Sequence, residues 1–402
     1  MSISIAINQA LALSIINVKS FPHRINNYLV SIISIACVAA VILTVLTMTQ
    51  GMIKTLAQSG HHNTLLVMRS GAVSELQSVM FPSEVNLLAN HQQILRDKDN
   101  RPLYSAEMFV NAELSSQSNE HVPAKIEKLA LRGISENTFY FRPDFKIVSG
   151  KKFKTGIRQL IIGQAISRRM PELMVGKTIK LGGTKWLISG VFSDNNSVFE
   201  SEIWADLGMV QSDYQRGNSI QSLRLAIKEG TDIANLNQEW QIDPRLNVRT
   251  ELEQVFFANQ GENLTRLIRW VGFPVAIIMA LGAIIAALNT MYSAIASRSK
   301  EIATHKAIGF SPFAILFSII SEALLIALIA TMLAITPLYI LFDGWTASTQ
   351  NAATLSQLMF NFDISFTLIC QTIALSSLIG FLGGLLPAIK AMTLPITVAI
   401  RD

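Results

Sequence analysis

Long apolar runs alternate along the chain with polar stretches of mixed periodicity. Four of the apolar runs reach about 20 residues or more, the length that a helix needs to cross a hydrocarbon core about 30 Å thick. They are residues 27–49, 270–292, 313–341 and 364–389. The pattern predicts four transmembrane helices.

The polar segment between the first two runs, residues 50–269, is large enough to bury a core of its own. Strand patterns recur in it. Residues 63–71 close on a glycine, and the runs 178–181 and 186–189 flank Gly182-Gly183, which is a hairpin signal. We expect a large α+β domain outside the membrane.

Local signals in this domain predict further elements. Residues 222–227 alternate polar and apolar side chains, which indicates a half-buried strand. One helix is expected to follow Pro82 with Ser83 as its N-cap, and another is expected to be capped by Thr231 or Asp232.

The residues ahead of the first apolar run show helical spacing. Apolar side chains recur there at intervals of four, at Ile3, Ile7, Leu11 and Ile15. Residues 1–26 are therefore expected to form an amphipathic helix at the membrane interface, ended by Phe21-Pro22. A flexible leader is the alternative.

Basic residues near the ends of the apolar runs indicate orientation, because short loops rich in positive charge stay in the cytoplasm. They are Lys19, Arg24, Arg298, Lys300, Lys306, Lys390 and Arg401. The short loop at residues 342–363 has no Lys or Arg. We therefore expect the termini, the segment 293–312 and the tail 390–402 in the cytoplasm, with residues 50–269 outside. The basic residues follow the first apolar stretch, so no cleaved signal peptide is expected.

Composition agrees with a membrane protein and argues against a nucleic-acid-binding protein and against a domain held by disulfides. Half of the 402 residues are hydrophobic, 15% are charged, and the mean hydropathy is +0.38. The net charge of +5 is spread over several loops and is too small to indicate a nucleic-acid partner. Cys37 and Cys370 both fall in predicted spans, so the external domain is expected to be held by packing and not by disulfides.

The sequence contains no recognisable catalytic constellation. Residues 175–178 read VGKT, but Pro171 stands where a phosphate-binding loop needs glycine. His61, His62 and His91 lack companion residues at metal-site spacing. We expect no catalytic residue, no metal ligand and no cofactor on this chain.

The segment Ser297–Pro312, between the second and third runs, predicts a short helix with a defined end. Gly309 suits a C-terminal cap, and Ser311-Pro312 suits the start of the next helix. The candidate contact residues of this segment are Arg298, Lys300, Glu301, Ile302, His305, Lys306, Ile308 and Gly309. A rigid helix here suits a cytoplasmic partner that pushes on it. A solvated basic turn that only obeys the orientation rule is the alternative.

Three features inside the predicted spans need an explanation. Glu322 lies ten residues past Pro312, about 15 Å into its span, where a carboxyl group must face protein. We interpret it as a protonated group hydrogen-bonded to a neighbouring helix, with a coupling or dimer contact as the alternative. Gly380 and Gly384 form a G-x-x-x-G pair that favours close helix packing, and Pro337 is expected to kink or end its helix.

The segment SRSKEIATHKAIGFSP and the span after it resemble FtsX-like permeases, where an Arg-x-x-Glu-Ile run and an Ala-Ile-Gly triplet join the second and third spans. His305 departs from the basic or apolar residue usual at its position. The ending GGLLPAIKAMTLPITVAIRD is similar to that of the same family, and its matching residues are Gly384, Pro387, Ala388, Ala391, Pro395 and Arg401. YFRPDFKIVSGKKF and VGKTIKLGGTKWLISGVF resemble the MacB-type periplasmic core.

This resemblance implies the permease subunit of a mechanotransmission ABC transporter in the bacterial inner membrane. Such subunits pair as homodimers or heterodimers. They bind two copies of an ATPase through the helix between spans two and three, and they move external domains. The resemblance also implies a smaller β lobe in the external domain, expected at about residues 139–206. MacB carries its ATPase ahead of the first span. Here about 26 residues precede that span and no Walker A motif is present, so ATP and Mg are expected on a separate subunit.

The leading functional hypothesis is export with a periplasmic membrane-fusion adaptor and an outer-membrane channel. One alternative is lipoprotein release, as in LolC and LolE. Another is an FtsX-like regulator that transports nothing and activates an external enzyme.

Overall fold

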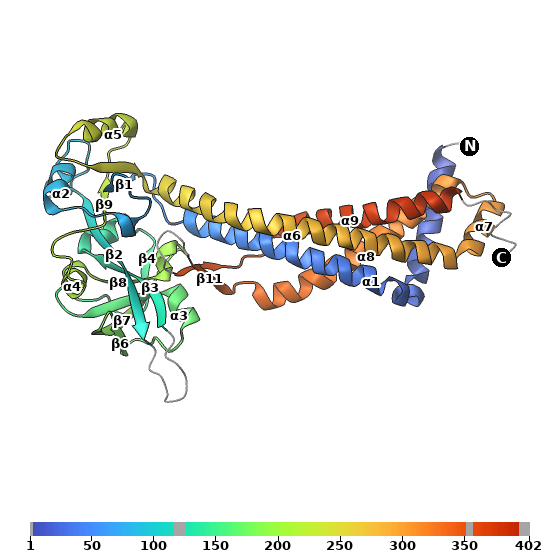
Figure 1. The fold of residues 1–402 in the computed structure, drawn as a ribbon, viewed down its shortest axis with the longest axis horizontal. Helices are drawn as coiled ribbons and strands as arrows, with labels where there is room; N and C mark the ends of the chain where they lie inside the picture. The colour runs from blue at the N-terminus through green and yellow to red at the C-terminus, as the bar shows by residue number, and fades with distance from the viewer. Residues whose placement is uncertain (1–2, 116–125, 351–356, 394–402) are drawn as a thin grey trace. The chain divides into compact units, whose positions relative to one another are not determined.

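The structure, a computed structural model, describes residues 3–115, 126–350 and 357–393. It contains two compact units, and each is described by itself. The membrane unit consists of Met1–Gln50, Leu267–Gly344 and Asp363–Asp402, and the sheet unit of Gly51–Arg266 and Trp345–Phe362. Helices α1 (Ile3–Ala57) and α6 (Glu253–Ser297) contribute residues to both units (Figure 1).

Four helices of the described chain are long and apolar enough to cross a membrane, as the hydropathy pattern predicted. Their apolar stretches are Arg24–Ala57 in α1, Ile268–Ser297 in α6, Pro312–Phe342, which is helix α8, and Phe366–Thr393, which is helix α9. Within the membrane unit these helices share an apolar core with the short helix α7 (Ser299–Ala307). Pro337 lies inside α8 and does not end it.

Helix α1 continues through the proline at which the sequence predicted its end. Pro22 lies inside the helix, and Figure 1 shows α1 changing direction in its first half. A proline inside a helix removes one backbone hydrogen bond and bends the helix without always ending it. Here Phe21 is buried and stacks on Tyr28, with ring centroids 5.7 Å apart, so the residues on both sides of the proline share one core. The predicted end at Phe21-Pro22 is wrong. Leu11 and Ile15, on the predicted interfacial face, are exposed.

Helices α8 and α9 approach each other closely along small residues. A Cβ atom added at Gly380 would lie 2.6 Å from the Cβ of Ala327, and one added at Gly384 would lie 2.5 Å from the Cβ of Ala323. Real Cβ atoms do not come this close to neighbouring carbon atoms, so the helix backbones themselves are in contact. This is the close packing expected of the G-x-x-x-G pair.

The sheet unit is built on one ten-stranded mixed sheet. Neighbouring strands follow the order β10-β1-β9-β2-β3-β8-β5-β7-β4, and β6 pairs with β2 and β7. The strands are β1 (Thr64–Arg69), β2 (Tyr104–Ser115), β3 (Ile126–Ile134), β4 (Phe145–Gly150), β5 (Gln159–Gly163), β6 (Thr178–Leu181), β7 (Thr184–Asp194), β8 (Glu202–Asp206), β9 (Ser222–Ala226) and β10 (Val248–Leu252). The pairs β3–β8 and β5–β7 are parallel.

Short helices complete this unit. The α-helices are α2 (Pro82–Ala89), α3 (Gln164–Arg169), α4 (Leu207–Asp213) and α5 (Ile233–Ile242), and the 3₁₀ helices are η1 (Glu75–Gln77), η2 (Glu136–Phe141) and η3 (Val198–Ser201). One apolar core joins β1 and β9 to α2 and α5. A second joins β2, β3, β5, β6, β7 and β8 with α3 and α4. This second core takes residues from Met108 onward, so it also includes strands that precede the expected lobe at residues 139–206.

Strand β9 is buried on both of its faces. Leu223 and Leu225 enter the first apolar core, and Arg224 between them is also fully buried. The prediction of a half-buried strand is therefore wrong. The polar positions of the alternating pattern face a buried charged layer and not solvent.

Most of the predicted turns and caps are present in the sheet unit. Gly182 and Gly183, with φ of +55° and +93°, join β6 to β7 in the predicted hairpin. Asp232 caps α5, because its carboxylate accepts the backbone N–H groups of residues 234 and 235. The predicted cap Ser83 is wrong, since Pro82 is already the first residue of α2.

Residues 342–363 form more than a connecting loop. Strands β11 (Thr346–Gln350) and β12 (Gln357–Asn361) pair as an antiparallel hairpin that belongs to the sheet unit. Met359 of β12 is buried in the second apolar core. Its N–H donates to the Ser201 hydroxyl oxygen at 2.9 Å, and that hydroxyl donates to the Met359 carbonyl at 3.2 Å.

Replacement of Gly384 by Val should separate α8 from α9 and destabilise the membrane unit by about 1–3 kcal/mol, because the new methyl groups have no room beside Ala323. Gly282→Val in α6 is the matched control, since a Cβ there meets no atom within 4 Å. Thermal unfolding of the detergent-solubilised chain measures both. Equal melting temperatures for the two variants would show that this glycine is not a packing contact.

Candidate functional site

Helix α7 is a short, defined element between two membrane helices. Ile302 and Ala303 are buried in the membrane-unit core, whereas Lys300 and Thr304 are exposed. The helix ends at a glycine, as predicted: Gly309 has φ of +101°, a conformation that side-chain-bearing residues rarely adopt.

The chain re-enters the membrane unit directly after this turn. The Phe310 N–H donates to the His305 carbonyl at 3.0 Å, which closes the end of α7. Ser311 then caps α8 by accepting the Ala314 N–H at 3.2 Å. The stretch therefore has the geometry of a rigid helix and turn.

Arg298, just before α7, is the centre of a polar cluster in the membrane unit. Its guanidinium donates to both carboxylate oxygens of Glu322 at 3.1 and 3.0 Å and to the Asn17 side-chain oxygen at 2.5 Å. The Tyr28 hydroxyl donates to the same Glu322 carboxylate at 2.8 Å. Glu322 thus accepts the expected bond from a neighbouring helix. Both of its oxygens also accept from an arginine 24 residues away at ion-pair distance, which does not fit the predicted protonated carboxyl group.

Glu301 contacts its own chain. The Arg24 guanidinium donates to its two oxygens at 3.1 and 3.2 Å, and Arg298 donates to it at 3.2 Å. Burial raises the pKa of Glu301, but the two guanidinium groups outweigh this and hold the pKa below its ordinary value. Lys306 donates to the Met392 carbonyl of α9 at 2.8 Å.

The eight candidate contact residues therefore divide into two groups. Arg298, Glu301 and Lys306 hold α7 to the rest of the membrane unit, and Ile302 packs beneath it. The group available to a partner is Lys300, Ile308 and Gly309, with Ile308 72% exposed. His305 lies between the groups, and its ring forms a T-shaped pair with the Phe310 ring, with centroids 5.5 Å apart.

A small cavity of about 30 Å³ lies beside this cluster, inside the membrane unit. Its polar lining residues are Asn17, Arg298, Glu301, His305, Ser318 and Glu322. A cavity of this size and polarity has room for one or two water molecules. It is too small for a transported molecule.

The sheet unit holds a second, larger polar network. Seven of its buried charged side chains are connected: Glu75, Glu107, Arg132, Arg142, Glu202, Arg224 and Glu253. Four neighbouring strands, β9, β2, β3 and β8, carry Arg224, Glu107, Arg132 and Glu202 respectively. They share one sheet face because the register pairs Glu107 with residue 222 and Arg132 with residue 109.

Two arginines connect the strands of this network. Arg132 contacts Glu75 and Glu107 at 2.9 Å each and Glu202 at 2.6 Å. Arg224 contacts Glu107 at 2.6 Å and Glu75 at 3.1 Å. Each buried charge thus has several opposite partners, as burial requires.

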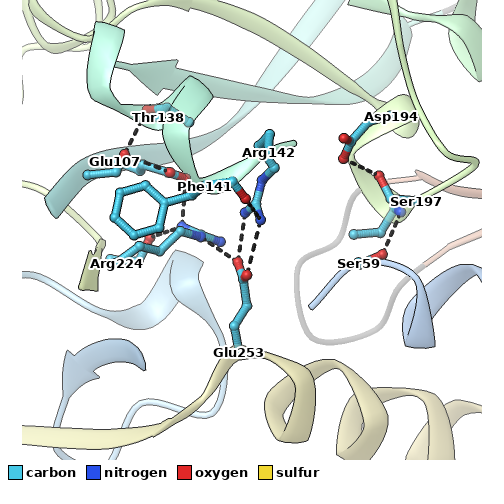
Figure 2. A network of polar contacts seen from close by, with 12 residues as sticks. Ser59, Glu107, Thr138, Phe141, Arg142, Asp194, Ser197, Arg224 and Glu253 are labelled. Atoms are coloured by element: carbon cyan, nitrogen blue, oxygen red, sulfur yellow. Dashed lines mark hydrogen bonds and ion pairs between the residues drawn. The ribbon is translucent and has the colours of Figure 1, made fainter. Parts of the chain in front are cut away.

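Glu253, the first residue of α6, joins this helix to the network. Figure 2 shows Arg142 and Arg224 pointing at its carboxylate, at 2.7 and 2.6 Å. The Phe199 ring lies 3.9 Å from the Arg142 guanidinium. Burial raises the pKa of Glu253, but Arg142 and Arg224 outweigh burial and lower it to about 2.

Sequence reasoning missed most of these groups. Tyr28, Asn17 and Arg24 looked like ordinary residues of an apolar or interfacial helix, and the strand arginines looked like solvent-facing positions. Their partners lie up to 301 residues away in the membrane unit and up to 149 in the sheet unit. The one available signal was charge on strands whose other face is strongly apolar.

The fold combines four helices that are long and apolar enough to cross a membrane with a large mixed sheet domain. Residues 27–241 match the MacB-like periplasmic core domain, and residues 274–396 match the FtsX-like permease C-terminal region. The chain belongs to this family of ABC transporter permeases. Pro395 and Arg401, part of the resemblance noted above, lie outside the described residues.

Curated relatives are longer than this chain. The macrolide export ATP-binding/permease proteins MacB of Escherichia coli (strain K12) and Shigella flexneri are each 26% identical over 242 residues, which is 57% of this chain and 36% of theirs. The match thus spans about a third of their length.

Two solved structures are also similar. The periplasmic region of MacB from Actinobacillus actinomycetemcomitans is 13% identical with a TM-score of 0.38, covering 51% of this chain and 94% of that one. The extracellular domain of the ABC-type transporter YknZ from Gram-positive bacteria is 13% identical with a TM-score of 0.36, covering 47% and 100%.

Replacement of Glu253 by Gln should lower the unfolding free energy by about 3–5 kcal/mol at pH 7, because Arg142 and Arg224 each lose a buried partner. A carboxylate with a depressed pKa stabilises the fold above its unfolded pKa, near 4.5, and loses this effect as pH falls toward 2. The parent and the variant should therefore converge in melting temperature below about pH 4. Exposed Glu229→Gln is the control and should match the parent throughout. A gap that stays constant from pH 7 to pH 3 would contradict the charge pairing.

A double-mutant cycle tests the contact of Arg298 with Glu322. Arg298→Gln and Glu322→Gln should each lower the melting temperature. The double variant should lose less than their sum, with a coupling of about 1–3 kcal/mol. Glu322→Leu should cost more than Glu322→Gln, since it also removes the acceptor of the Tyr28 hydroxyl. Strict additivity of the two Gln variants would mean that no ion pair forms.

Proposed function

We propose that this chain is the transmembrane subunit of an ABC transporter that couples ATP hydrolysis by a separate cytoplasmic ATPase to movement of its external sheet unit. Helix α7 carries the proposal. Its inner side is fixed to the membrane unit by Arg298 and Glu301, and its outer side exposes Lys300 and Ile308. A connecting loop needs neither the anchor nor the exposed apolar residue.

A firmly anchored helix can pass on a displacement that a loop would absorb. An ATPase that moves the outer side of α7 would displace Arg298 and with it α8, because the guanidinium contacts Glu322 inside that helix. The polar cluster would then carry force between the partner and the membrane helices.

The remaining assignments follow from the family and from the charge pattern. The chain lies in the bacterial inner membrane with α7 and both termini in the cytoplasm and the sheet unit in the periplasm. Two ATPase copies supply ATP and Mg, and the permease acts as a homodimer or as a heterodimer with a related subunit. The relatives named for macrolide export support export as the activity, with a periplasmic membrane-fusion adaptor and an outer-membrane channel as further partners.

Replacement of Ile308 by Asp should abolish co-purification of the ATPase, because it puts a charge into the apolar contact that the partner makes with α7. Ile242→Asp is the matched control, since Ile242 in α5 is also 72% exposed. Both variants should insert and unfold like the parent. The measurement is pull-down from membranes of the native host, with mass spectrometry identifying a Walker-motif ATPase, followed by ATP turnover of the complex.

Gly309→Val tests the role of α7 by distorting the turn that follows the helix. A β-branched residue resists φ of +101°, so the turn should distort while an added Cβ meets no atom within 4 Å. We expect a complex that hydrolyses ATP without supporting export. Glu301→Lys is less informative, because it breaks the contacts with Arg24 and Arg298. If Ile308→Asp and Gly309→Val both bind, hydrolyse and export like the parent, α7 is not the coupling site.

A further inference from the structure

Positive charge is concentrated in one short part of the sheet unit. Residues 146–185 contain ten Lys and Arg residues and a single acidic residue, Glu172, whereas the whole chain has 33 basic and 28 acidic residues. The rest of the chain therefore has more acidic than basic residues. Neither the fold nor the proposed coupling explains this concentration.

Five of these basic residues lie along β4, β6 and the start of β7, at the end of the strand order, and of these strands β6 also pairs with β2 at Leu181. Strand β4 ends the strand order, and β4 and β6 pair with different parts of the same strand, β7. The two strands meet end to end: the Lys151 N–H donates to the Ser189 carbonyl at 2.8 Å, and the Ile188 N–H donates to the Lys177 carbonyl at 2.9 Å. We call residues 145–151 and 176–180, together with Lys185, the basic edge.

The lysines of the basic edge are exposed. In residues 3–115, 126–350 and 357–393 no ion pair joins Lys146, Lys151, Lys177, Lys180 or Lys185 to a carboxylate. Lys180 and Lys185 stand directly opposite each other in the β6–β7 ladder. Like charges in opposed positions destabilise a sheet, so this pair costs stability unless an anion approaches.

Exposed apolar side chains lie between these charges. Val148 is 54% exposed, Met174 64% and Val175 39%. A Cβ at Gly150 would lie 2.9 Å from a Val175 methyl carbon, which places Val175 against the edge. Apolar centres with a charged rim are typical of protein interfaces, whereas a small-anion site needs buried donors that converge.

The form of the edge indicates what fits it. Six residues of β4 and four of β6 extend over about 30 Å at about 3.3 Å per residue, so the charges follow a line. Lysines and the irregularity between Ile147 and Ser149 hinder pairing with an uncharged strand. A chain with its own negative charges would turn this repulsion into attraction. We propose that the basic edge is a docking surface for an acidic, extended segment of a protein partner.

Fluorescence anisotropy with a labelled ten-residue peptide of alternating Glu and Thr tests the proposal on the full chain in a zwitterionic detergent. The Glu peptide should bind, its Lys–Thr counterpart should not, and added salt should weaken binding. Lys146→Glu combined with Lys180→Glu should weaken binding at least about tenfold. The control pair Lys98→Glu with Lys228→Glu makes the same charge change at exposed positions away from the edge and should bind like the parent.

The Lys146→Glu, Lys180→Glu variant must lose peptide affinity while its size-exclusion elution volume and its melting temperature stay those of the parent. Failure of the parent to bind the Glu peptide, or equal weakening in the control pair, would overturn the proposal. So would edge-dependent binding of dihexanoylphosphatidylglycerol, a soluble anionic lipid, without peptide binding, because the partner would then be lipid. The assay contains no ATPase, so its failure leaves the role proposed for α7 unaffected.

Discussion

Paired burial of charge is the constraint on which the sheet unit depends. Burial of a charged side chain without water or an opposite charge costs several kcal/mol of folding free energy. Seven such groups can therefore be buried only if each of them contacts a group of opposite charge. Arg132 and Arg224 satisfy this by each contacting three carboxylates from different elements. The network therefore specifies the strand neighbours and the start of α6 together, and the apolar cores then fill the opposite face.

The same rule explains the polar cluster of the membrane unit. Glu322 could not remain in an apolar helix facing lipid, and its position is made tolerable by the Tyr28 hydroxyl and the Arg298 guanidinium. Arg298 belongs to the start of α7, so one contact both accommodates the carboxylate and anchors the short helix. Glu322, a carboxyl group inside an apolar helix, thus attaches the candidate coupling site to α8.

The two surfaces open to partners differ in physical character. At α7 few residues are exposed to a partner, and one of them, Ile308, is apolar. Ion pairs hold this helix to the membrane unit. On the basic edge the exposed lysines follow an extended line, and no ion pair joins them to a carboxylate within the described part of the chain. The first suits a compact contact that transmits displacement, and the second suits attraction that depends on ionic strength.

The sequence by itself determined the features that rest on neighbouring residues. The four apolar helices, the helix and glycine turn around Gly309, the hairpin at Gly182-Gly183 and the cap at Asp232 all follow from local hydropathy, spacing and backbone preference. Only the tertiary structure decided that α1 continues through Pro22, that β12 joins the sheet unit, and that the polar face of β9 is buried. It also decided that Glu301 contacts Arg24 and that Glu322 meets Arg298. The reason is that burial and charge pairing depend on residues far apart in the chain, which no local pattern specifies.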